Sequence, residues 1–369
     1  MADLKFRPFS LEDWFAKYEL QCRINISESG VLPIDFGWFN TDLDDLRLHY
    51  SHMLGDLELR ELIARDYPGL SPDRILVTTG CIEANFAAIA SMVQPGDHVI
   101  VEHPNYQQLY EVPLALGGKV ELLRLRYEND YKLNVDELNE MVTPKTKLVV
   151  ISHPNNPTGS VITLETLRGI VEIVEDNDAY LLSDEIYREL AFTRKPLPPA
   201  ATLSDHAISS ASMSKLHGLP GLRIGWMVAD ETIIDIAKEI RSYTTICNST
   251  LGECLSKLAF KRKDELVARA ERIATTNLRV LKEWVEGRDD VDWVPPEGGL
   301  VAIPRFYRDA TSTELCSLLA EKYKVFLVPG VCFDLERQFR TGFGWSKEEL
   351  REGLEFLGKA LDSFEPLRK

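Results

Sequence analysis

Between residues 74 and 229 the chain repeats one unit, a short apolar run that ends in polar residues or glycine. Seven such runs occur, at 74–80, 97–106, 119–125, 146–159, 179–187, 207–215 and 223–229. Helical patterns follow two of them, at 81–93 and 164–177. This alternation is typical of a mostly parallel α/β sheet, and the near-continuous apolar runs indicate strands covered on both faces. We therefore predict an α/β protein whose large domain contains a mostly parallel seven-stranded sheet.

The chain outside this repeat is organised differently. Residues 1–46 are irregular except for one helical segment near 10–20, and beyond residue 230 a long helical stretch is followed by short apolar runs and a final helix. A chain of 369 residues is long for a single domain. We expect three parts: an N-terminal arm that joins the small domain at 1–46, the large domain at 47–275, and a smaller α+β domain at 276–369.

Charge and composition exclude several classes of protein. The formal net charge of −16 argues against a nucleic-acid surface, which needs a basic stripe. No apolar run approaches the roughly 20 residues of a membrane-spanning helix, and the N-terminal residues lack the pattern of a signal peptide. The six cysteines are scattered without a CxxC spacing, so we expect reduced thiols and neither a metal site nor a disulfide. We expect a cytoplasmic protein without nucleic-acid or membrane partners.

Ligands of such sheets bind outside the carboxyl ends of the strands, and one group of residues there suits an anion. The first strand ends at Gly80, directly before a helix whose free N–H groups and dipole favour negative charge. Taken alone, Gly80 also fits an ordinary strand-to-helix turn. Ser212 and Ser214 follow the sixth strand, and Arg223 comes after a Gly/Pro turn. Two hydroxyls, a permanent cation and the helix start could together hold a phosphate dianion.

A second group of strand-end residues suits a planar ligand. Tyr106 could stack on a ring or simply pack, and Asn156 in "HPNNPTG" could bond a ligand oxygen or close an Asx-type turn. Asp184 needs a cation or donors, which a protonated ring nitrogen or a structural salt bridge would supply, and Tyr187 would place its phenol nearby. Lys215 stands in the bend "SMSKLHGLPGLRIGW", whose glycines allow close backbone approach.

A lysine near a phosphate cradle, an aromatic plate and a carboxylate fits a Schiff base to pyridoxal phosphate (PLP). The carboxylate would keep the pyridine nitrogen protonated, so that the ring accepts electrons from the substrate's Cα. The freed lysine amine could then move the Cα proton. We therefore predict PLP as the cofactor and Lys215 as its attachment point.

The sequence resembles the class I/II aminotransferases of PLP fold type I over nearly its whole length. The Schiff-base signature is "SMSKLHGLPGLRIGW", and "HPNNPTG" and "SDEIY" stand in the expected order before it. "YSHMLGDLELR", "VPGVCF" and "FRTGFG" are similar to further segments of the family. The resemblance implies an aspartate aminotransferase-like fold, with amino acids and 2-oxo acids as substrates.

The resemblance also implies a role for each matching residue. Lys215 would bind the cofactor covalently, Asp184 would pair with the pyridine nitrogen, Asn156 and Tyr187 would bond the phenolic oxygen, and Tyr106 would stack on the ring. The phosphate would be held by the start of the helix after the first strand and by strand-end side chains, namely Gly80, Cys81, Ile82, Ser212, Ser214 and Arg223.

The remaining implied contacts involve the substrate and a second subunit. Arg340 would bind the substrate's α-carboxylate bidentately, with Asn156 also near the substrate and Gly37 lying over it. Tyr50 would reach the phosphate of the neighbouring subunit, which implies a homodimer with active sites at the subunit interface.

Two places depart from the usual family pattern. His217 occupies a position that is more often aromatic or aliphatic; it either packs or contacts the substrate, and we expect packing. Residues 25–39, together with 11–15, are similar to a subgroup that includes capreomycidine synthase, whose members act on arginine derivatives. Glu28 and Asp35 could meet a cationic side chain, although we expect them to be solvated loop acids.

The leading functional hypothesis is an aminotransferase that moves an amino group between an L-amino acid and a 2-oxo acid. The alternative keeps PLP but eliminates, cyclises or oxidises an arginine-derived amino acid. A third hypothesis, a PLP-binding regulator or an inactive paralogue, is disfavoured: we see no basic helix-turn-helix before the fold, the chain is acidic, and the complete set of site residues argues against inactivity.

Overall fold

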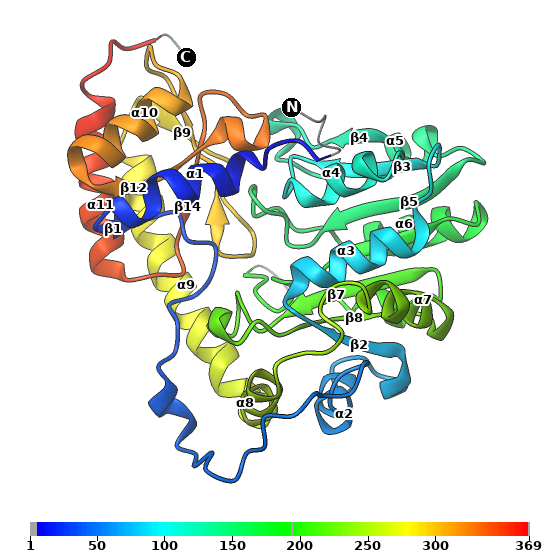
Figure 1. Cartoon of the computed structure of the whole chain (residues 1–369). Coiled ribbons are helices and arrows are strands. Elements are labelled where there is room, and N and C mark those ends of the chain that lie inside the picture. The colour runs from blue at the N-terminus through cyan, green and yellow to red at the C-terminus, as the bar shows by residue number, and fades with distance from the viewer. Residues whose placement is uncertain (1–5, 193–194, 368–369) are drawn as a thin grey trace, which may run out of the picture.

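The computed structural model describes residues 6–192 and 195–367, and a seven-stranded sheet lies at the centre of its larger part (Figure 1). Its strands are β2 (Ile75–Thr78), β3 (His98–His103), β4 (Lys119–Arg124), β5 (Thr146–Ser152), β6 (Tyr180–Asp184), β7 (Ala207–Ser212) and β8 (Gly225–Val228). Their spatial order is β2-β8-β7-β6-β5-β3-β4. Only β8 is antiparallel to its neighbours in this sheet, so the predicted mostly parallel seven-stranded sheet is confirmed.

The sheet is covered on both faces, as its apolar strands predict. Val99 and Val101 of β3 belong to a core cluster that includes residues of α3, α4 and α7, whereas Ile100 between them belongs to the cluster on the opposite face. The alternation follows from the two-residue period of a strand. A third cluster packs β2 and β8 against the helices α2 and α8.

The helices begin where the sequence supplies a cap or an acidic first turn. They are α1 (Ser10–Tyr18), α2 (Leu57–Ala64), α3 (Cys81–Met92), α4 (Gln108–Ala115), α5 (Val135–Met141), α6 (Leu164–Asp176), α7 (Glu231–Arg241), α8 (Thr250–Phe260), α9 (Lys263–Glu286), α10 (Ser312–Leu318) and α11 (Lys347–Leu361). Thr163 and Ser346, for example, accept backbone N–H groups at the starts of α6 and α11. Helices α4 and α5 are not among the elements predicted from the sequence; both are short, and α4 contains Pro113.

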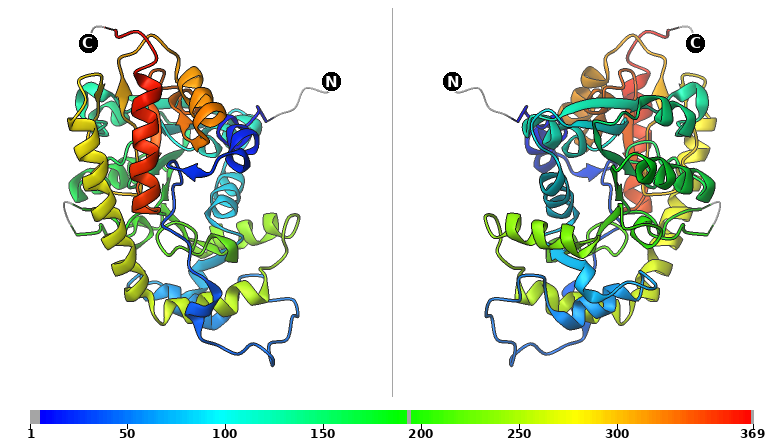
Figure 2. Two further views of the ribbon diagram at one scale, coloured as in Figure 1. Left: turned by 90° about the vertical axis from the view of Figure 1, so that its left-hand side faces the viewer. Right: turned by 90° about the vertical axis from the view of Figure 1, so that its right-hand side faces the viewer.

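The C-terminal part forms a smaller α+β body to which the N-terminus returns. Its short strands are β1 (Ile24–Asn25), β9 (Val291–Asp292), β10 (Val301–Ala302), β11 (Arg305–Phe306), β12 (Val325–Phe326), β13 (Val328–Pro329) and β14 (Phe339–Gly342). Strand β1 pairs in parallel with β12, which joins two segments 301 residues apart. Helix α9 runs along the molecule into this body (Figures 1 and 2). It crosses the predicted boundary at 275/276 without a break, and the domain boundaries stay a prediction.

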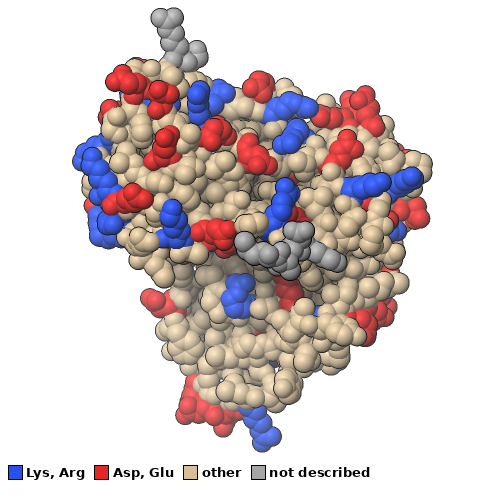
Figure 3. Space-filling model, turned by 45° about the horizontal axis from the view of Figure 1, so that its top comes forward, with Lys and Arg blue, Asp and Glu red and all other residues tan. Residues whose placement is uncertain are grey.

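The surface carries charges of both signs. On the face drawn in Figure 3, basic and acidic side chains alternate over the upper part, and the lower front is mainly uncharged. In the part of the chain that the structure describes, none of the helices has the length and apolar character needed to cross a membrane.

Candidate active site

A cavity of about 370 Å³ lies outside the carboxyl ends of β5, β6 and β7, where ligands of α/β sheets bind. Ser152, Asp184 and Ser212, the last residues of these three strands, line it. It brings together twelve of the residues singled out in the sequence: Glu28, Cys81, Ile82, Tyr106, Asn156, Asp184, Tyr187, Ser212, Ser214, Lys215, Arg223 and Arg340. Residues far apart in the chain therefore share one chamber.

Asp184 places a carboxylate at the floor of the cavity. Its Oδ2 accepts a hydrogen bond from Asn85 Nδ2 at 2.8 Å, and its Oδ1 accepts one from the backbone of Ile186 at 3.2 Å. Burial raises the pKa of Asp184, because the charged form loses hydration. A cation opposite this carboxylate would offset that loss, and the protonated nitrogen of a pyridine ring meets the requirement.

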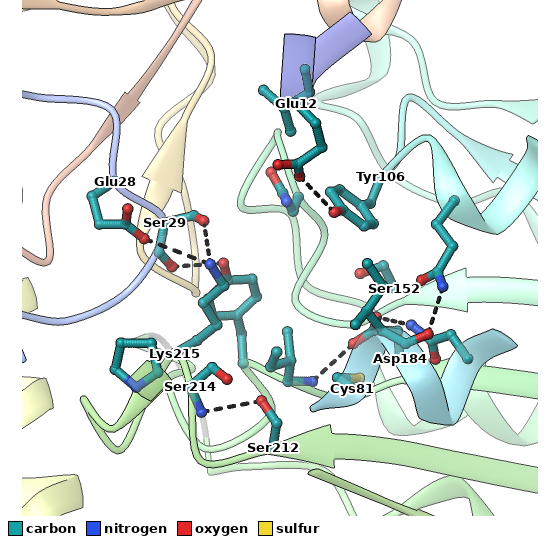
Figure 4. A pocket seen from close by; sticks show the side chains of 18 of the residues that line it. Glu12, Glu28, Ser29, Cys81, Tyr106, Ser152, Asp184, Ser212, Ser214 and Lys215 are labelled. Carbon is teal, nitrogen blue, oxygen red and sulfur yellow. Dashed lines mark hydrogen bonds and ion pairs between the residues drawn. The ribbon is translucent and has the colours of Figure 1, made fainter. Parts of the chain in front are cut away.

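Lys215 points into the cavity from the loop after β7, and the N-terminal segment contacts its amine (Figure 4). The Nζ atom donates a hydrogen bond to Ser29 Oγ at 2.8 Å and lies 3.6 Å from Glu28 Oε1. The carbonyl oxygen of Ser29 accepts the hydroxyl of Tyr187 at 2.7 Å. Residues 28 and 29 thus bring a carboxylate and a hydroxyl to the amine.

The expectation that Glu28 is a solvated loop acid is wrong. Its side chain is only 25% exposed and lines the cavity, and the N–H of Gly30 donates to its Oε1 at 3.0 Å. Burial raises the pKa of Glu28, but Lys215, Arg340 and the backbone N–H groups of Ser29 and Gly30 together lower it by more, so its pKa lies below the usual value and the carboxylate is charged. Asp35, by contrast, is exposed to solvent as expected.

The start of α3 and the loop after β7 form an anion cradle. Gly80 has a φ of +80°, which favours glycine, and a Cβ on Gly225 would lie 2.4 Å from the carbonyl carbon of Gly80. The backbones of β8 and the α3 N-terminus therefore approach as closely as glycine permits. Arg223 Nη1 lies 3.5 Å from Ser214 Oγ, and Ser212 Oγ accepts the N–H of Ser214 at 3.1 Å. Hydroxyls, a guanidinium and helix N–H groups converge there, which fits a phosphate.

Arg340 is buried, with 1% of its surface exposed, and it lines the cavity. Its Nη1 donates to Asn156 Oδ1 at 3.4 Å and its Nη2 donates to the carbonyl oxygen of Ser27 at 3.1 Å. Its Nε has no hydrogen-bond partner among the residues described. An unpaired buried donor is costly, and a bidentate carboxylate would satisfy it.

Several predicted residues lie outside the cavity. Gly37 belongs to a short 3-10 helix at Phe36–Phe39, and residues 28–30 lie against Lys215 in its place. Tyr50 is 85% exposed in the segment before α2. His217 is buried on the far side of the lysine loop, in agreement with the packing expected for it.

The structure adds residues that sequence reasoning did not assign. Glu12 of α1 accepts the Tyr106 hydroxyl at 2.8 Å, and Asn85 of α3 accepts the hydroxyl of Ser210 while holding Asp184. Asn85 falls one helical turn after Cys81, a spacing that could have indicated it. Nothing local in the sequence indicates Glu12 or Ser29, because both reach the site through the packing of the N-terminal segment.

The fold and the site together define an enzyme of the PLP-dependent class, with a lysine, a buried carboxylate and a phosphate cradle at one edge of a mostly parallel sheet. Residues 42–357 match the family described as aminotransferase class I and II. The chain belongs to this family.

Individual relatives cover nearly the whole chain. The protein is 32% identical to capreomycidine synthase from Streptomyces vinaceus over 95% of this chain and 93% of that one, and 30% identical to an aspartate aminotransferase from Thermotoga maritima over 85% and 84%. Among solved structures, a PLP-dependent aminotransferase from Streptococcus suis superposes with a TM-score of 0.93 at 31% identity, covering 99% and 100% of the two chains. A PLP-dependent cyclase, OrfR, superposes with a TM-score of 0.91 at 32% identity, covering 97% of each.

Proposed function

We propose that this protein is a PLP-dependent aminotransferase that moves an amino group between an L-amino acid and a 2-oxo acid. The observation that carries the proposal is that one cavity is lined by the Lys215 amine, the Asp184 carboxylate and the Arg340 guanidinium, whose Nε has no hydrogen-bond partner among the described residues. The three groups supply a point of attachment, a partner for the ring nitrogen and a partner for the substrate's carboxylate.

PLP, when bound, supplies an electron-poor ring that accepts the electron pair released at the substrate's Cα and carries the amino group between substrates. The residues of this chain bind and orient the cofactor and the substrate. Arg223, Ser212 and Ser214 would hold the phosphate, and Arg340 would hold the substrate's carboxylate so that its Cα–H faces Lys215. The amine of Lys215 would take and return the Cα proton as general base and acid.

The charge balance of the cavity favours a particular side chain on the substrate. The lining contains three cations, Lys215, Arg223 and Arg340, and three carboxylates, Glu12, Glu28 and Asp184. In the proposed roles the cofactor and the substrate's carboxylate engage the three cations and Asp184. Two carboxylates then remain for the rest of the substrate, which favours a cationic side chain over a second carboxylate.

This balance supports a second candidate function, the elimination or cyclisation of an arginine-derived amino acid. Glu28 next to the reacting amine is the specific observation in its favour, because a guanidinium could pair with that carboxylate. The similarity to capreomycidine synthase extends over nearly the whole chain, which is consistent with the same reading.

One experiment separates the two candidates. The PLP-loaded protein is mixed with arginine, hydroxyarginine, ornithine, alanine and aspartate, with and without 2-oxoglutarate, and products are identified by mass spectrometry. Amino transfer consumes the oxo acid and yields glutamate. Elimination or cyclisation proceeds without an oxo acid and gives a dehydrated, deaminated or cyclic product. If every amino acid is recovered unchanged under all conditions, both candidates are contradicted.

We also propose a homodimer whose active sites lie at the subunit interface. Leu48 and Tyr50, in the segment before α2, are 80% and 85% exposed, and Tyr243 after α7 is 92% exposed. This segment loops away from the rest of the chain at the bottom of Figures 1 and 2. Large exposed apolar groups of this kind favour a partner surface. The cytoplasmic location stays a prediction.

A further inference from the structure

A second, much smaller cavity lies behind the active site, and we call it the rear chamber. It measures about 20 Å³ and is lined by residues that follow α2, by the start of α9 and by the loops after β6 and β7. Ser212 and Ile186 line both the rear chamber and the active-site cavity. The rear chamber therefore lies directly beneath the end of β6, which carries Asp184, and the loop that carries Lys215.

His217 presents a hydrogen-bond acceptor to the rear chamber. Its Nδ1 lies 3.2 Å from the carbonyl oxygen of Ser212. A carbonyl can only accept, so Nδ1 carries the hydrogen of this bond. Burial lowers the pKa of His217, which keeps the ring neutral and leaves Nε2 as an acceptor. The buried Nε2 has no partner in the part of the chain described.

Glu185 presents a second acceptor to the same chamber. Its Oε1 is occupied, because it accepts the N–H of Ala200 at 2.7 Å and the hydroxyl of Ser209 at 2.8 Å. Its Oε2 is buried and makes no hydrogen bond to any described residue, although Arg188 Nε lies 3.5 Å away as an ion-pair partner. The other charged side chains of the chamber pair with one another, since Lys263 contacts both Asp66 and Glu189 at 2.5 Å.

One hydrogen-bond donor that reaches both His217 Nε2 and Glu185 Oε2 would satisfy the two buried acceptors of this small cavity. With Glu185 charged and His217 neutral, the two groups cannot bond to each other; His217 Nε2 then costs free energy while it lacks a partner, and Glu185 Oε2 has only its ion pair with Arg188. A cavity of about 20 Å³ has room for one water molecule, which offers two donors and needs polar partners. Of the chamber's other donors, Arg188 and Lys263 are engaged in ion pairs, Trp226 donates to the Tyr67 hydroxyl, and Tyr67 keeps its own hydroxyl hydrogen as a further possible donor.

We propose that the rear chamber binds one water molecule that donates hydrogen bonds to His217 Nε2 and to Glu185 Oε2, and that His217 and Glu185 are positioning residues for the active site. Glu185 follows Asp184, and His217 lies two residues after Lys215 and bonds to Ser212. The bridge would tie the ends of β6 and β7 together from behind, and so fix the carboxylate, the amine and the phosphate cradle relative to one another. This inference does not depend on which reaction the enzyme performs.

The first test is a crystal structure of the PLP-loaded protein at a resolution that shows ordered water. A water within hydrogen-bonding distance of both His217 Nε2 and Glu185 Oε2 is expected. A chamber without that water, or one closed by a direct contact from Lys263 to His217, would overturn the proposal.

The second test is a double-mutant cycle in solution that uses His217→Phe, Glu185→Gln and the double variant. The readouts are the dissociation constant for PLP and the absorbance spectrum of bound PLP as a function of pH, neither of which requires turnover. Each single variant should weaken PLP binding about fivefold or more, the cost of leaving one buried polar group unpaired. The double variant should be no weaker than the worse single one, because both changes remove the same bridge.

Matched variants keep this test decisive. Trp226→Phe changes another residue of the rear chamber, one whose N–H is donated to Tyr67 and not to the bridge, and its effect should add to that of Glu185→Gln. His217→Gln restores an acceptor and should recover part of the lost affinity even if His217→Phe fails to fold. Additive effects of the His217 and Glu185 changes, or PLP binding and a PLP spectrum that are unaltered in both His217→Phe and Glu185→Gln, would contradict the bridge.

Discussion

At the residue scale, the amine of Lys215 is the group on which the proposed chemistry depends. Replacing Lys215 with Ala should abolish the covalent attachment of PLP and lower turnover by at least about a thousandfold, because both the attachment point and the proton carrier are lost. Borohydride reduction followed by peptide mass spectrometry measures the attachment. Lys119→Ala, an exposed lysine of β4, is the control and should behave as the wild type. Normal turnover in Lys215→Ala would refute the proposed role.

Glu28 should act on the choice of substrate. If a cationic side chain pairs with its carboxylate, Glu28→Gln should lower kcat/KM for arginine-type substrates about 10- to 100-fold, since a hydrogen bond to a charged group contributes about 1.5–3 kcal/mol. The kcat/KM of the Glu28→Gln protein for alanine as substrate should change by no more than about twofold. Steady-state kinetics with both substrates measures the difference. Asp35→Asn, on the same segment but exposed, is the matched control. An equal loss of kcat/KM for both substrates would show that Glu28 does not recognise the substrate's side chain.

At the element scale, one buried carboxylate connects two of the loops that form the site. Glu102, near the end of β3, accepts hydrogen bonds from the backbone of Ser152 at 2.9 Å and from Asn155 Nδ2 at 3.1 Å. It also accepts a hydrogen bond at 3.2 Å from Nδ2 of Asn105, the residue directly before Tyr106. The turn after β5 and the loop after β3 are thereby held together. Burial nevertheless raises the pKa of Glu102 to about 7.

The raised pKa of Glu102 makes stability depend on pH. The folded state binds this proton more tightly than the unfolded chain, so the associated stability is present below about pH 4.5 and is lost as pH rises through about 7. The difference between the Glu102 pKa in the unfolded chain, 4.5, and in the folded protein, about 7, corresponds to roughly 3 kcal/mol of stability at about 1.4 kcal/mol per pH unit. Urea unfolding of Glu102→Gln between pH 5 and 8 should show a flatter pH dependence than the wild type. Glu140→Gln, an exposed acid, should not alter it. A slope in Glu102→Gln identical to the wild type would contradict the prediction.

At the scale of the whole molecule, the proposed shared active site can be tested by complementation. Lys215→Ala and Tyr50→Ala proteins are each expected to be impaired. When they are mixed and allowed to exchange subunits, one site of each mixed dimer would combine an intact Lys215 with an intact Tyr50 from the partner. Activity should therefore recover to about a quarter of the wild-type value at equal mixing, as expected for random pairing into dimers. Sedimentation measures the dimer itself. No recovery on mixing would show that Tyr50 does not act across the interface.

The sequence by itself determined the sheet and the part of the site that its strands carry. A strand end fixes the direction of its side chains, so Asp184, Ser212 and Lys215 could be placed at one edge from local pattern alone. Arg340 required the resemblance to a family, since no nearby pattern connects it to the sheet. Tertiary structure alone brought Ser29 to Lys215, 186 residues away in the chain. That contact depends on the close approach of the N-terminal segment to β14, where a Cβ on Gly342 would lie 1.9 Å from the carbonyl oxygen of Glu28, and packing between distant elements has no local signature.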